Sequence, residues 1–538
     1  MNRILKGLLV TALAVSATQV SAYTNKTFLM PRPVGVDLPM EMTTFHELVE
    51  HKGHDRFGGT FAVTGFGKGT SSDGMGRYFL FNNKDTVTLS EGLNGDGAGH
   101  PAVATTSDLD LRYLIHDFAG TNNAAVQPGF PFPVTVGLSP EQTAYGVRFD
   151  YHQCLGKILK GLYFYANLPV AHVQNDLKLN IGGTPVNYTP GVVVAGPTTP
   201  SVQTTLANYF AGTFSNPSTA AGVPANSQVA LTNAKIAGKR SETGVADIDL
   251  GLGYKFLHKE RYHAALAIAV TIPTGDEADG AYLFDAIVGN GDHFALGGDL
   301  CAGARIWGDC DHNLKLNLSM KYRYLFESTE KRTLGIKGRN FGQYLLLVPA
   351  ATTLPVSFVP AANVTTLNVD VTPGSQFDGI LGFTYNNGGF TFDLGYNLYF
   401  REEEDVKLKG AFTDGSYAIA NVTANATTLA TRDAAGVAVP AAPPIAGGAT
   451  PTPLVVATYI DGATVAAQTA NILTKATLDL DAASTPSQLT NGIYTGIGYS
   501  FKEWDTPLML GLGGKYEWAS KNSAFDQWTV YGKIGIGF

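Results

Sequence analysis

Hydrophobic and polar residues alternate with a period of two over many stretches of the chain. At the C-terminus, one face carries Trp528, Val530, Ile534, Ile536 and Phe538, and the other carries Thr529, Tyr531 and Lys533. Such alternation is typical of a half-buried β-strand. Similar stretches lie at 244–256, 312–327, 389–401 and 507–518, each with one uncharged face. Long strands with one uncharged face are what a transmembrane β-barrel requires, because that face contacts lipid.

The pattern predicts an all-β, antiparallel transmembrane barrel of about 14 strands, within a range of 12–16. The predicted strands are 57–68, 76–84, 106–116, 142–152, 157–170, 243–257, 261–273, 293–307, 312–327, 374–386, 389–401, 491–502, 507–519 and 525–538. Tight turns and long connections alternate between most of them, which predicts short periplasmic turns and long external loops. The Gly-rich stretch 85–105 breaks this parity. Because lipid cannot satisfy an open sheet edge, the sheet must close.

The N-terminus predicts export. A short basic segment, an apolar run over 7–17 and small residues before Ala22 form a secretory signal peptide covering residues 1–22, with a membrane anchor as the alternative reading. Residues 23–56 either lie in the periplasm or fold into the lumen as a plug. The barrel then occupies 57–538, with large external loops at about 171–242 and 402–490. We therefore expect the outer membrane of a Gram-negative-type bacterium.

Composition excludes several classes of protein. Only 15% of the residues are charged, while the chain holds 62 Gly, 24 Tyr and 29 Phe. Typical soluble domains carry roughly 25% charged residues, and disordered chains are poor in aromatics. The net charge of −8 without basic blocks disfavours nucleic acid as a partner.

Charged residues on the inward-facing positions define the predicted lumen. The basic set is Arg112, Arg148, Lys255, Arg305, Lys315, Lys321, Arg323, Arg401, Lys515 and Lys533, and the acidic set is Asp110, Asp150, Asp247, Asp249, Asp299, Asp378, Asp393 and Glu517. Such groups need water or ion partners. The wide barrel favours a wet channel, and a salt-bridged interior is the alternative. Lys315, Lys321 and Arg323 form a basic stripe that would favour anions, unless carboxylates on neighbouring strands pair with it.

Few motifs suggest chemistry. The cluster from His46 to Asp55 departs from the zinc-protease pattern, and a polar linker is the favoured reading. The acidic run 401–405 is either a solvated loop base or a divalent-cation site for lipopolysaccharide. No nucleophile elbow or phosphate-binding loop occurs, so we expect no enzyme activity, no cofactor and no metal. Cys301 and Cys310 are candidates for a disulfide.

Two short motifs carry a family resemblance. The stretch Thr243-Gly-Val-Ala-Asp-Ile248, followed by Ile272-Pro-Thr-Gly-Asp276, resembles the outer-membrane proteins associated with meta-cleavage phenol degradation. These are related in architecture to fatty-acid and aromatic-hydrocarbon channels. The resemblance covers about 243–330, and Ala246 stands where the family has Gly. It implies a transport barrel, with small hydrophobic molecules as one substrate class.

The sequence thus predicts an outer-membrane channel that passes small solutes through a polar, mixed-charge lumen. The alternatives are a closed or plugged barrel that anchors Ala/Thr-rich surface loops, such as an adhesin, and a transporter of small hydrophobic or aromatic compounds. Expected partners are outer-membrane lipid, lipopolysaccharide, a small-molecule solute and the barrel-assembly machinery, which would read the terminal Phe538. A homo-oligomer stays open.

Overall fold

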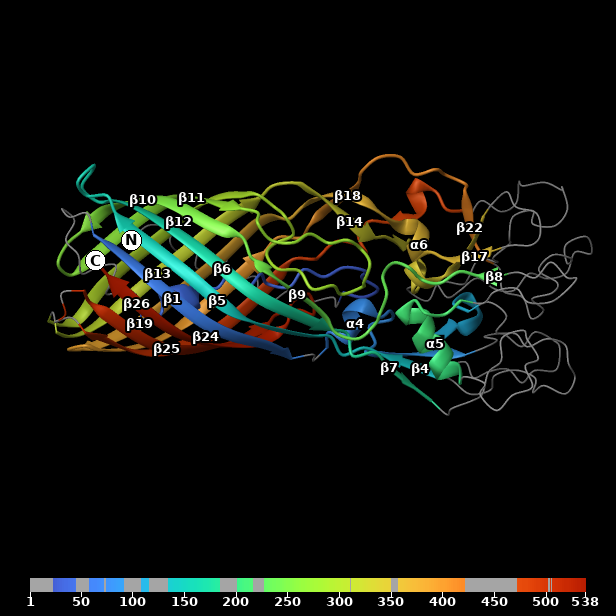
Figure 1. Cartoon of the computed structure of the whole chain (residues 1–538), viewed down its shortest axis with the longest axis horizontal. Coiled ribbons are helices and arrows are strands. Elements are labelled where there is room, and N and C mark those ends of the chain that lie inside the picture. Colours follow the sequence, from blue (N-terminus) through green and yellow to red (C-terminus); the bar gives the residue numbers. More distant parts are fainter. Residues whose placement is uncertain are drawn as a thin grey trace, which may run out of the picture.

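The protein folds as a closed antiparallel β-barrel that continues at one end into a cap of packed loops (Figure 1). The computed structural model describes residues 23–44, 58–71, 74–90, 108–115, 134–183, 201–215, 227–309, 311–349, 357–420, 472–501, 504 and 506–538. The barrel strands are β1 (Gly59–Ser71), β5 (Glu141–Cys154), β6 (Leu162–Asp176), β10 (Ile248–His258), β11 (Tyr262–Ile272), β12 (Ala295–Gly308), β13 (His312–Leu325), β19 (Gly374–Asn387), β20 (Phe390–Arg401), β24 (Gln488–Phe501), β25 (Leu508–Ala519) and β26 (Asp526–Gly537). The all-β barrel prediction is confirmed.

Closure of the barrel depends on the pairing of β6 with β10. The register Asp249↔Asn167 to Tyr254↔Leu162 joins the two sides of the sheet. A thirteenth strand, β9 (Arg240–Val245), pairs only with the outer half of β6 and stands outside the ring. The first and last strands also pair, since Gly59 and Phe538 exchange two backbone hydrogen bonds of 2.9 Å. No edge of the ring is therefore left open.

The barrel has twelve strands among the described residues, and the expectation of about 14 is not confirmed. Two predicted strands, 76–84 and 106–116, do not belong to the wall. The first contains the helix α4 (Gly76–Phe79), and the second contains the two-residue β3 (Leu109–Asp110) and the 3-10 helix η2 (Leu111–Tyr113). The connection between β1 and β5 is thus one long external segment. This removes the parity conflict at 85–105.

The outer surface of the barrel is apolar. Side chains that face away from the lumen are well exposed, including Leu252, Leu266, Ile268, Leu394, Ile493, Leu512, Val530 and Ile534. They alternate with buried residues that face the lumen, polar ones such as Arg323 beside Tyr322 on β13, or small ones such as Ala267 beside Ile268 on β11. Monomeric soluble proteins rarely expose continuous apolar surface on this scale, so the belt indicates burial in lipid. Among the described residues, no helix combines the length and apolar character needed to cross a membrane.

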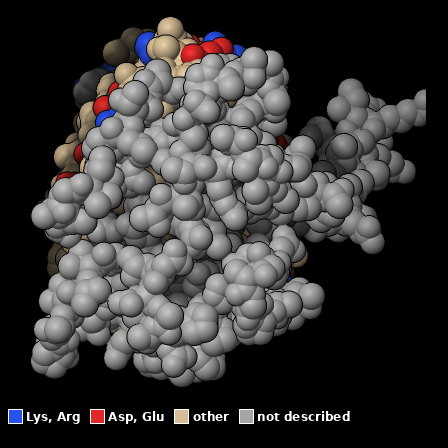
Figure 2. Space-filling view, turned by 90° about the vertical axis from the view of Figure 1, so that its right-hand side faces the viewer, with Lys and Arg blue, Asp and Glu red and all other residues tan. Residues whose placement is uncertain are grey.

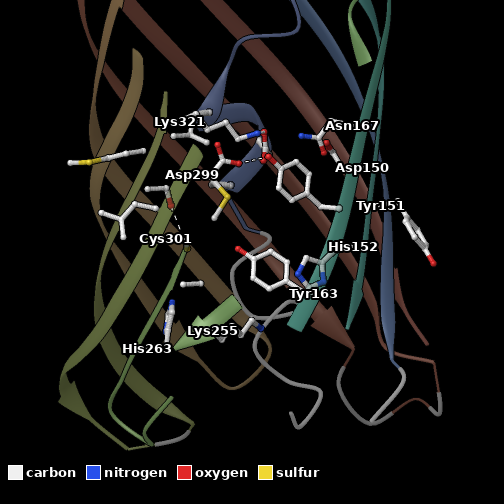
Figure 3. A pocket seen from close by; sticks show the side chains of 18 of the residues that line it. Asp150, Tyr151, His152, Tyr163, Asn167, Lys255, His263, Asp299, Cys301 and Lys321 are labelled. Atoms are coloured by element: carbon white, nitrogen blue, oxygen red, sulfur yellow. Dashed lines mark hydrogen bonds and ion pairs between the residues drawn. The ribbon is translucent and has the colours of Figure 1, made fainter. Parts of the chain in front are cut away.

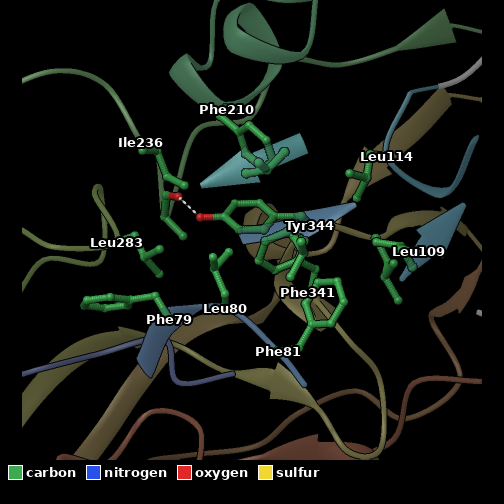
Figure 4. Packing of buried hydrophobic residues seen from close by; sticks show 14 of the residues in the cluster. Phe79, Leu80, Phe81, Leu109, Leu114, Phe210, Ile236, Leu283, Phe341 and Tyr344 are labelled. Carbon is green, nitrogen blue, oxygen red and sulfur yellow. Dashed lines mark hydrogen bonds between the residues drawn. The ribbon is translucent and has the colours of Figure 1, made fainter. Parts of the chain in front are cut away.

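The long connections at one end of the barrel, which the sequence predicts to be external, build a second hydrophobic core. Their elements are α4, β2 (Thr86–Ser90), β3, η2, β4 (Val134–Gly137), β7 (Asn180–Gly182), α5 (Val202–Ala211), β8 (Ser227–Gln228), β14 (Ser328–Thr333), β15 (Gly335–Ile336), η3 (Gly342–Tyr344), β16 (Leu346–Pro349), β17 (Ser357–Pro360), α6 (Ala362–Thr365), β18 (Thr366–Thr372), β21 (Asp405–Leu408), β22 (Tyr417–Ile419), η8 (Lys475–Thr477) and β23 (Leu478–Asp479). At the centre, Tyr344 packs edge-on against Phe210 and Phe341 and donates a 2.8 Å hydrogen bond to the Ala234 carbonyl (Figure 4). Viewed onto this end, the described residues at the upper rim show acidic and basic side chains together (Figure 2). We call this unit the cap.

Residues 23–44, which we call the inner segment, run from the cap into the barrel. At its start, the Tyr23 amide donates to Asn522, in the turn between β25 and β26. Its only helix, α2 (Leu38–Met42), begins with Pro39 in the first turn, and the Asp37 side chain caps the Met40 amide. Farther on, Thr43 and Thr44 pack against glycines of β24 and β25. The inner segment thus crosses from the cap toward the opposite end of the barrel, whose short turns are those predicted to be periplasmic.

Candidate functional site

Ion pairs to the barrel wall hold the inner segment. The Arg32 guanidinium lies 2.8 Å from the Asp378 carboxylate on β19 and 2.7 Å from Glu517 on β25. It also donates to Asn397 at 3.1 Å and lies 4.4 Å above the Tyr399 ring. All of these side chains are nearly fully buried. Arg32 is therefore fixed from three strands at once.

In a second contact between the inner segment and the wall, the inner segment provides the carboxylate and the wall provides the cation. Lys515 of β25 lies 2.8 Å from both Asp37 of the inner segment and Glu517 of its own strand. Glu517 thus accepts from a cation on the inner segment, Arg32, and a cation on the wall, Lys515. Removing one member of such a buried network leaves an unpaired charge in a medium of low polarity, which is strongly destabilising.

A third contact lies on α2. The Glu41 carboxylate pairs with Arg148 on β5 and, at 2.7 Å, with Lys321 on β13. Arg148 is also 2.6 Å from Asp150, and its guanidinium donates to the Gly35 carbonyl at 3.1 Å. Strands β5 and β13 lie nearly opposite each other in the barrel order. Glu41 therefore bridges the lumen from one wall to the other.

Two members of the predicted basic stripe on β13 pair with carboxylates of the barrel wall, Asp299 on the neighbouring β12 and Asp249 on β10. Arg323 lies 2.7 Å from Asp249 and 2.6 Å from Asp299, and Lys321 lies 3.3 Å from Asp249. Tyr165 donates its hydroxyl to Asp299 as well. The third member, Lys315, lies on β13 toward the periplasmic end, six residues from Lys321. The structure thus places Lys321 and Arg323 in the salt-bridged arrangement that was the alternative above.

Two cavities flank α2 on the β10–β13 side of the lumen. The first, of about 130 Å³, lies toward the periplasmic turns, and we call it the periplasmic cavity. Figure 3 shows His152 and Tyr163 pointing into it, with Lys321 and Asp299 at one end and Lys255 and His263 at the other. The second, of about 50 Å³, lies toward the cap between α2, β13 and β19, and we call it the outer cavity. Leu38, Glu41 and Lys321 line both cavities and therefore lie between them.

Aromatic side chains of the wall lie flat over glycines of the next strand. A Cβ atom on Gly253 would meet the Tyr163 ring at 2.1 Å, and one on Gly251 would meet Tyr165 at the same distance. Because these positions lack side chains, both rings lean along the wall and line the periplasmic cavity. The tyrosine–glycine pairing shapes the cavity.

The other predicted lumen residues have varied environments. Asp393 accepts the Thr44 amide at 2.7 Å, so it too binds the inner segment. Lys255 lines the periplasmic cavity. Arg305 reaches Glu260 in a periplasmic turn at 2.8 Å. Asp247 lines the outer cavity between β9 and β10.

Several further predictions fall on cap elements or on residues that are not described. Arg112 lies in η2 and Asp110 in β3, so neither belongs to a barrel strand, and their prediction as lumen positions is corrected. They were assigned by alternation in a stretch that folds into the cap. The 46–55 cluster and Cys310 lie outside the described residues. Phe538 directly follows β26, with its ring centroid 6.4 Å from that of Tyr151, and its role in assembly stays a prediction.

Two residues of the acidic run at 401–405, Arg401 and Glu404, belong to a buried network at the base of the cap, whereas Glu402, Glu403 and Asp405 are exposed. Glu404 accepts from Arg332 at 2.6 Å and from Arg401 at 2.9 Å. Beside them, Glu330 accepts from Arg332 at 2.9 Å and contacts the His293 ring at the same distance. These carboxylates hold protein cations. Within the described part of the chain, no group of three or more His, Cys, Asp or Glu side chains is placed to hold a metal ion.

Sequence reasoning missed the inner-segment side of the site, namely Arg32, Asp37 and Glu41. This segment has no alternation, and three prolines interrupt it at positions 31, 33 and 39. One usable signal was the charge imbalance of the predicted lumen, which has ten basic and eight acidic groups. Because buried cations need ionic partners, this imbalance indicates that carboxylates from another part of the chain enter the lumen. Asp37 and Glu41 supply two of them.

Comparisons with known proteins concern the fold. No family model and no curated protein matches the chain. Among solved structures, an outer-membrane channel from Pseudomonas putida F1 is 9% identical, over 90% of this chain and 96% of that chain, with a TM-score of 0.35. A FadL homologue of Pseudomonas aeruginosa is 9% identical over 96% and 98%, with a TM-score of 0.27. The toluene transporter TbuX of Ralstonia pickettii is 10% identical over 91% and 92%, with a TM-score of 0.24. The fold of this chain is established by its own strand pairing.

Proposed function

We propose that the chain is an outer-membrane channel for small solutes and that the inner segment is its gate. The observation that carries the proposal is the pair of cavities beside α2, with Leu38, Glu41 and Lys321 lining both. A solute that passes this contact moves from the outer cavity to the periplasmic cavity along the β10–β13 wall. The signal peptide delivers the chain to the periplasm, and the apolar belt fixes it in the membrane.

Ion pairs to the barrel wall hold the inner segment at both ends of the part that lies in the lumen. Arg32 binds wall carboxylates, while Asp37 and Glu41 bind wall cations. Ion pairs of this kind exchange partners without breaking any backbone ladder of the barrel. The wall therefore stays closed to lipid while the inner segment moves.

The volume and the lining residues of the periplasmic cavity indicate the class of solute. An engineered cavity of about 150 Å³ accommodates benzene, so the periplasmic cavity has room for roughly one six-membered ring. Its walls combine the Tyr163, Tyr165 and His152 rings with charged groups. Transport of small aromatic compounds therefore stays within this proposal, whereas long acyl chains exceed the cavity.

A reversible crosslink tests the gate. An ideal Cβ on Gly496 lies 3.6 Å from the Thr43 Cβ, within the range that a disulfide spans. The double variant Thr43→Cys/Gly496→Cys is made with Cys154, Cys301 and Cys310 changed to Ser. We expect the oxidised protein in planar bilayers to show little conductance and the reduced protein to recover it.

The single variant Thr43→Cys in the same background is the matched control, and its conductance should not respond to reductant. Conductance that is equal in the oxidised and reduced double variant would contradict a moving gate. A folded barrel that never conducts would favour the closed anchor that displays surface loops.

A further inference from the structure

The Glu41 carboxylate occupies a position where two wall cations converge on a single oxygen. Its Oε2 atom accepts from the Arg148 guanidinium and, at 2.7 Å, from the Lys321 ammonium. Arg148 is 1% exposed and Glu41 15% exposed. This carboxylate also separates the two cavities. A group that is held by cations and blocks the path is the group that a solute has to displace.

The charges around this point balance only while a carboxylate is present. Three cations, Arg148, Lys321 and Arg323, pair with four carboxylates, Glu41, Asp150, Asp249 and Asp299. A fourth cation, Lys533, lies beside them and donates to the backbone oxygens of Glu41 and Thr43, at 2.7 and 3.1 Å. When Glu41 moves away, the four cations of this group face three carboxylates, and Arg148 and Lys321 each lose one of their two ion pairs. Removing one member of a buried ion-pair network is unfavourable. A neutral solute cannot offset that cost, but a solute that brings its own carboxylate can.

The periplasmic cavity supplies a place for the rest of such a solute. His152 and Tyr163 stack with ring centroids 5.0 Å apart, and Lys321 lies 5.2 Å from the centre of the Tyr165 ring. All four residues line the cavity. Aromatic walls favour a flat ring, and the cations at the Glu41 end fix the direction of its acidic group.

We propose that this site binds small aromatic monocarboxylates of about the size of benzoate, whose carboxylate takes the place of Glu41 between Arg148 and Lys321. The proposal rests on the channel function above and names its substrate class. Binding and gating are then one event, because the solute that fits is the one that releases α2. Glu41 acts as a tethered competitor of the substrate.

Uptake of radiolabelled benzoate into liposomes that contain the mature chain tests this proposal, with benzyl alcohol as the neutral solute of the same shape. Glu41→Gln removes the competitor, and we expect the half-saturating benzoate concentration to fall about tenfold. Lys321→Gln removes one cation of the site, and we expect it to rise at least tenfold, as for loss of a charged hydrogen bond. Lys407→Gln, in an exposed pair with Asp405 on the cap, is the matched control and should change neither value.

Opposite shifts in the two lumen variants, absent for benzyl alcohol, support the proposal. Because Lys321→Gln also alters the wall, heat-modifiable migration checks that each variant is folded, and Glu41→Gln gives an independent reading. Saturable benzoate uptake with an unchanged half-saturating concentration in Glu41→Gln overturns the substrate class and leaves the channel function intact. Absence of uptake of either solute in every folded variant overturns the substrate class and the channel function together.

Discussion

The Arg32 guanidinium, on a segment that belongs to no strand, lies 2.7 Å from the Glu517 carboxylate of β25, 485 positions away in the sequence. Both side chains are almost completely buried, at 4% and 0% exposed. Neither charge is tolerable there without the other. The position of the inner segment and the charge of the wall therefore depend on each other.

Arg32→Ala should release the inner segment. It leaves the Asp378 and Glu517 carboxylates without their common partner, and breaking one side of a buried pair costs about 3–5 kcal/mol. We expect faster amide hydrogen exchange over 31–44 and a higher conductance in planar bilayers. Arg77→Ala is the control, because its pair with Asp85 on the cap is 39% and 44% exposed and such pairs contribute roughly 0–1 kcal/mol. Equal exchange in both variants would argue against Arg32 as an anchor.

The base of the cap should weaken in acid through Glu404. Burial raises the pKa of this carboxyl, but the Arg332 and Arg401 guanidiniums outweigh burial and lower the pKa to about 2, from an ordinary value of 4.5. A lowered folded-state pKa stabilises the fold above pH 4.5, and this contribution, about 3 kcal/mol, is lost as the pH falls to about 2.

Thermal unfolding of the cap, followed by near-UV circular dichroism between pH 6 and 2, measures this contribution. Glu404→Gln should lower the midpoint at pH 6, and its midpoint should depend less on pH than that of the unchanged protein. The difference between the two curves isolates Glu404 from the other carboxylates. Parallel curves would show that the Glu404 charge does not stabilise the cap.

The barrel strands were predictable because each depends on a local pattern. Ten of the twelve wall strands keep the predicted ends to within three residues; β6 is shifted outward, and the strand predicted at 243–257 is divided into β9 and β10. The division falls where the Ala246 amide bonds to the Pro169 carbonyl, since a proline in β6 interrupts the ladder. Alternation alone does not report a break in the partner strand.

The predicted strand at 76–84 was wrong for a different reason. Tyr78, Phe79, Leu80 and Phe81 are all 0% exposed, because the cap surrounds them on every side. A short run of apolar residues that is buried on all sides has no hydrophobic periodicity, so its sequence does not distinguish a strand from a turn or a helix. The contacts of the inner segment were beyond prediction too, since they join residues hundreds of positions apart and follow no period.

Gly395→Val should destabilise the wall through the tyrosine beside it. A Cβ on Gly395 would lie 2.5 Å from the Tyr494 ring, and that ring is held between β20 and β24. Overpacking of this kind costs about 1–3 kcal/mol. We expect a lower urea midpoint for unfolding in detergent micelles. Gly65→Val is the matched control, because no atom lies within 4 Å of its Cβ position. A shift of equal size in both variants would assign the effect to the general loss of glycine.

A pair of isoleucines tests where lipid covers the barrel. Ile268 is 71% exposed in the middle of β11, and Ile158 is 72% exposed in the turn between β5 and β6. The two side chains have nearly equal exposed fractions, so a different response to substitution would report whether lipid or water surrounds each of them. Arginine at the midplane of a bilayer costs about 2–4 kcal/mol, and near the interface about 0–1 kcal/mol. We therefore expect Ile268→Arg to lower the free energy of unfolding in phospholipid vesicles by the larger amount and Ile158→Arg by the smaller one. In water both changes would be nearly neutral, so equal and small effects would mean that the apolar belt of β11 does not face lipid.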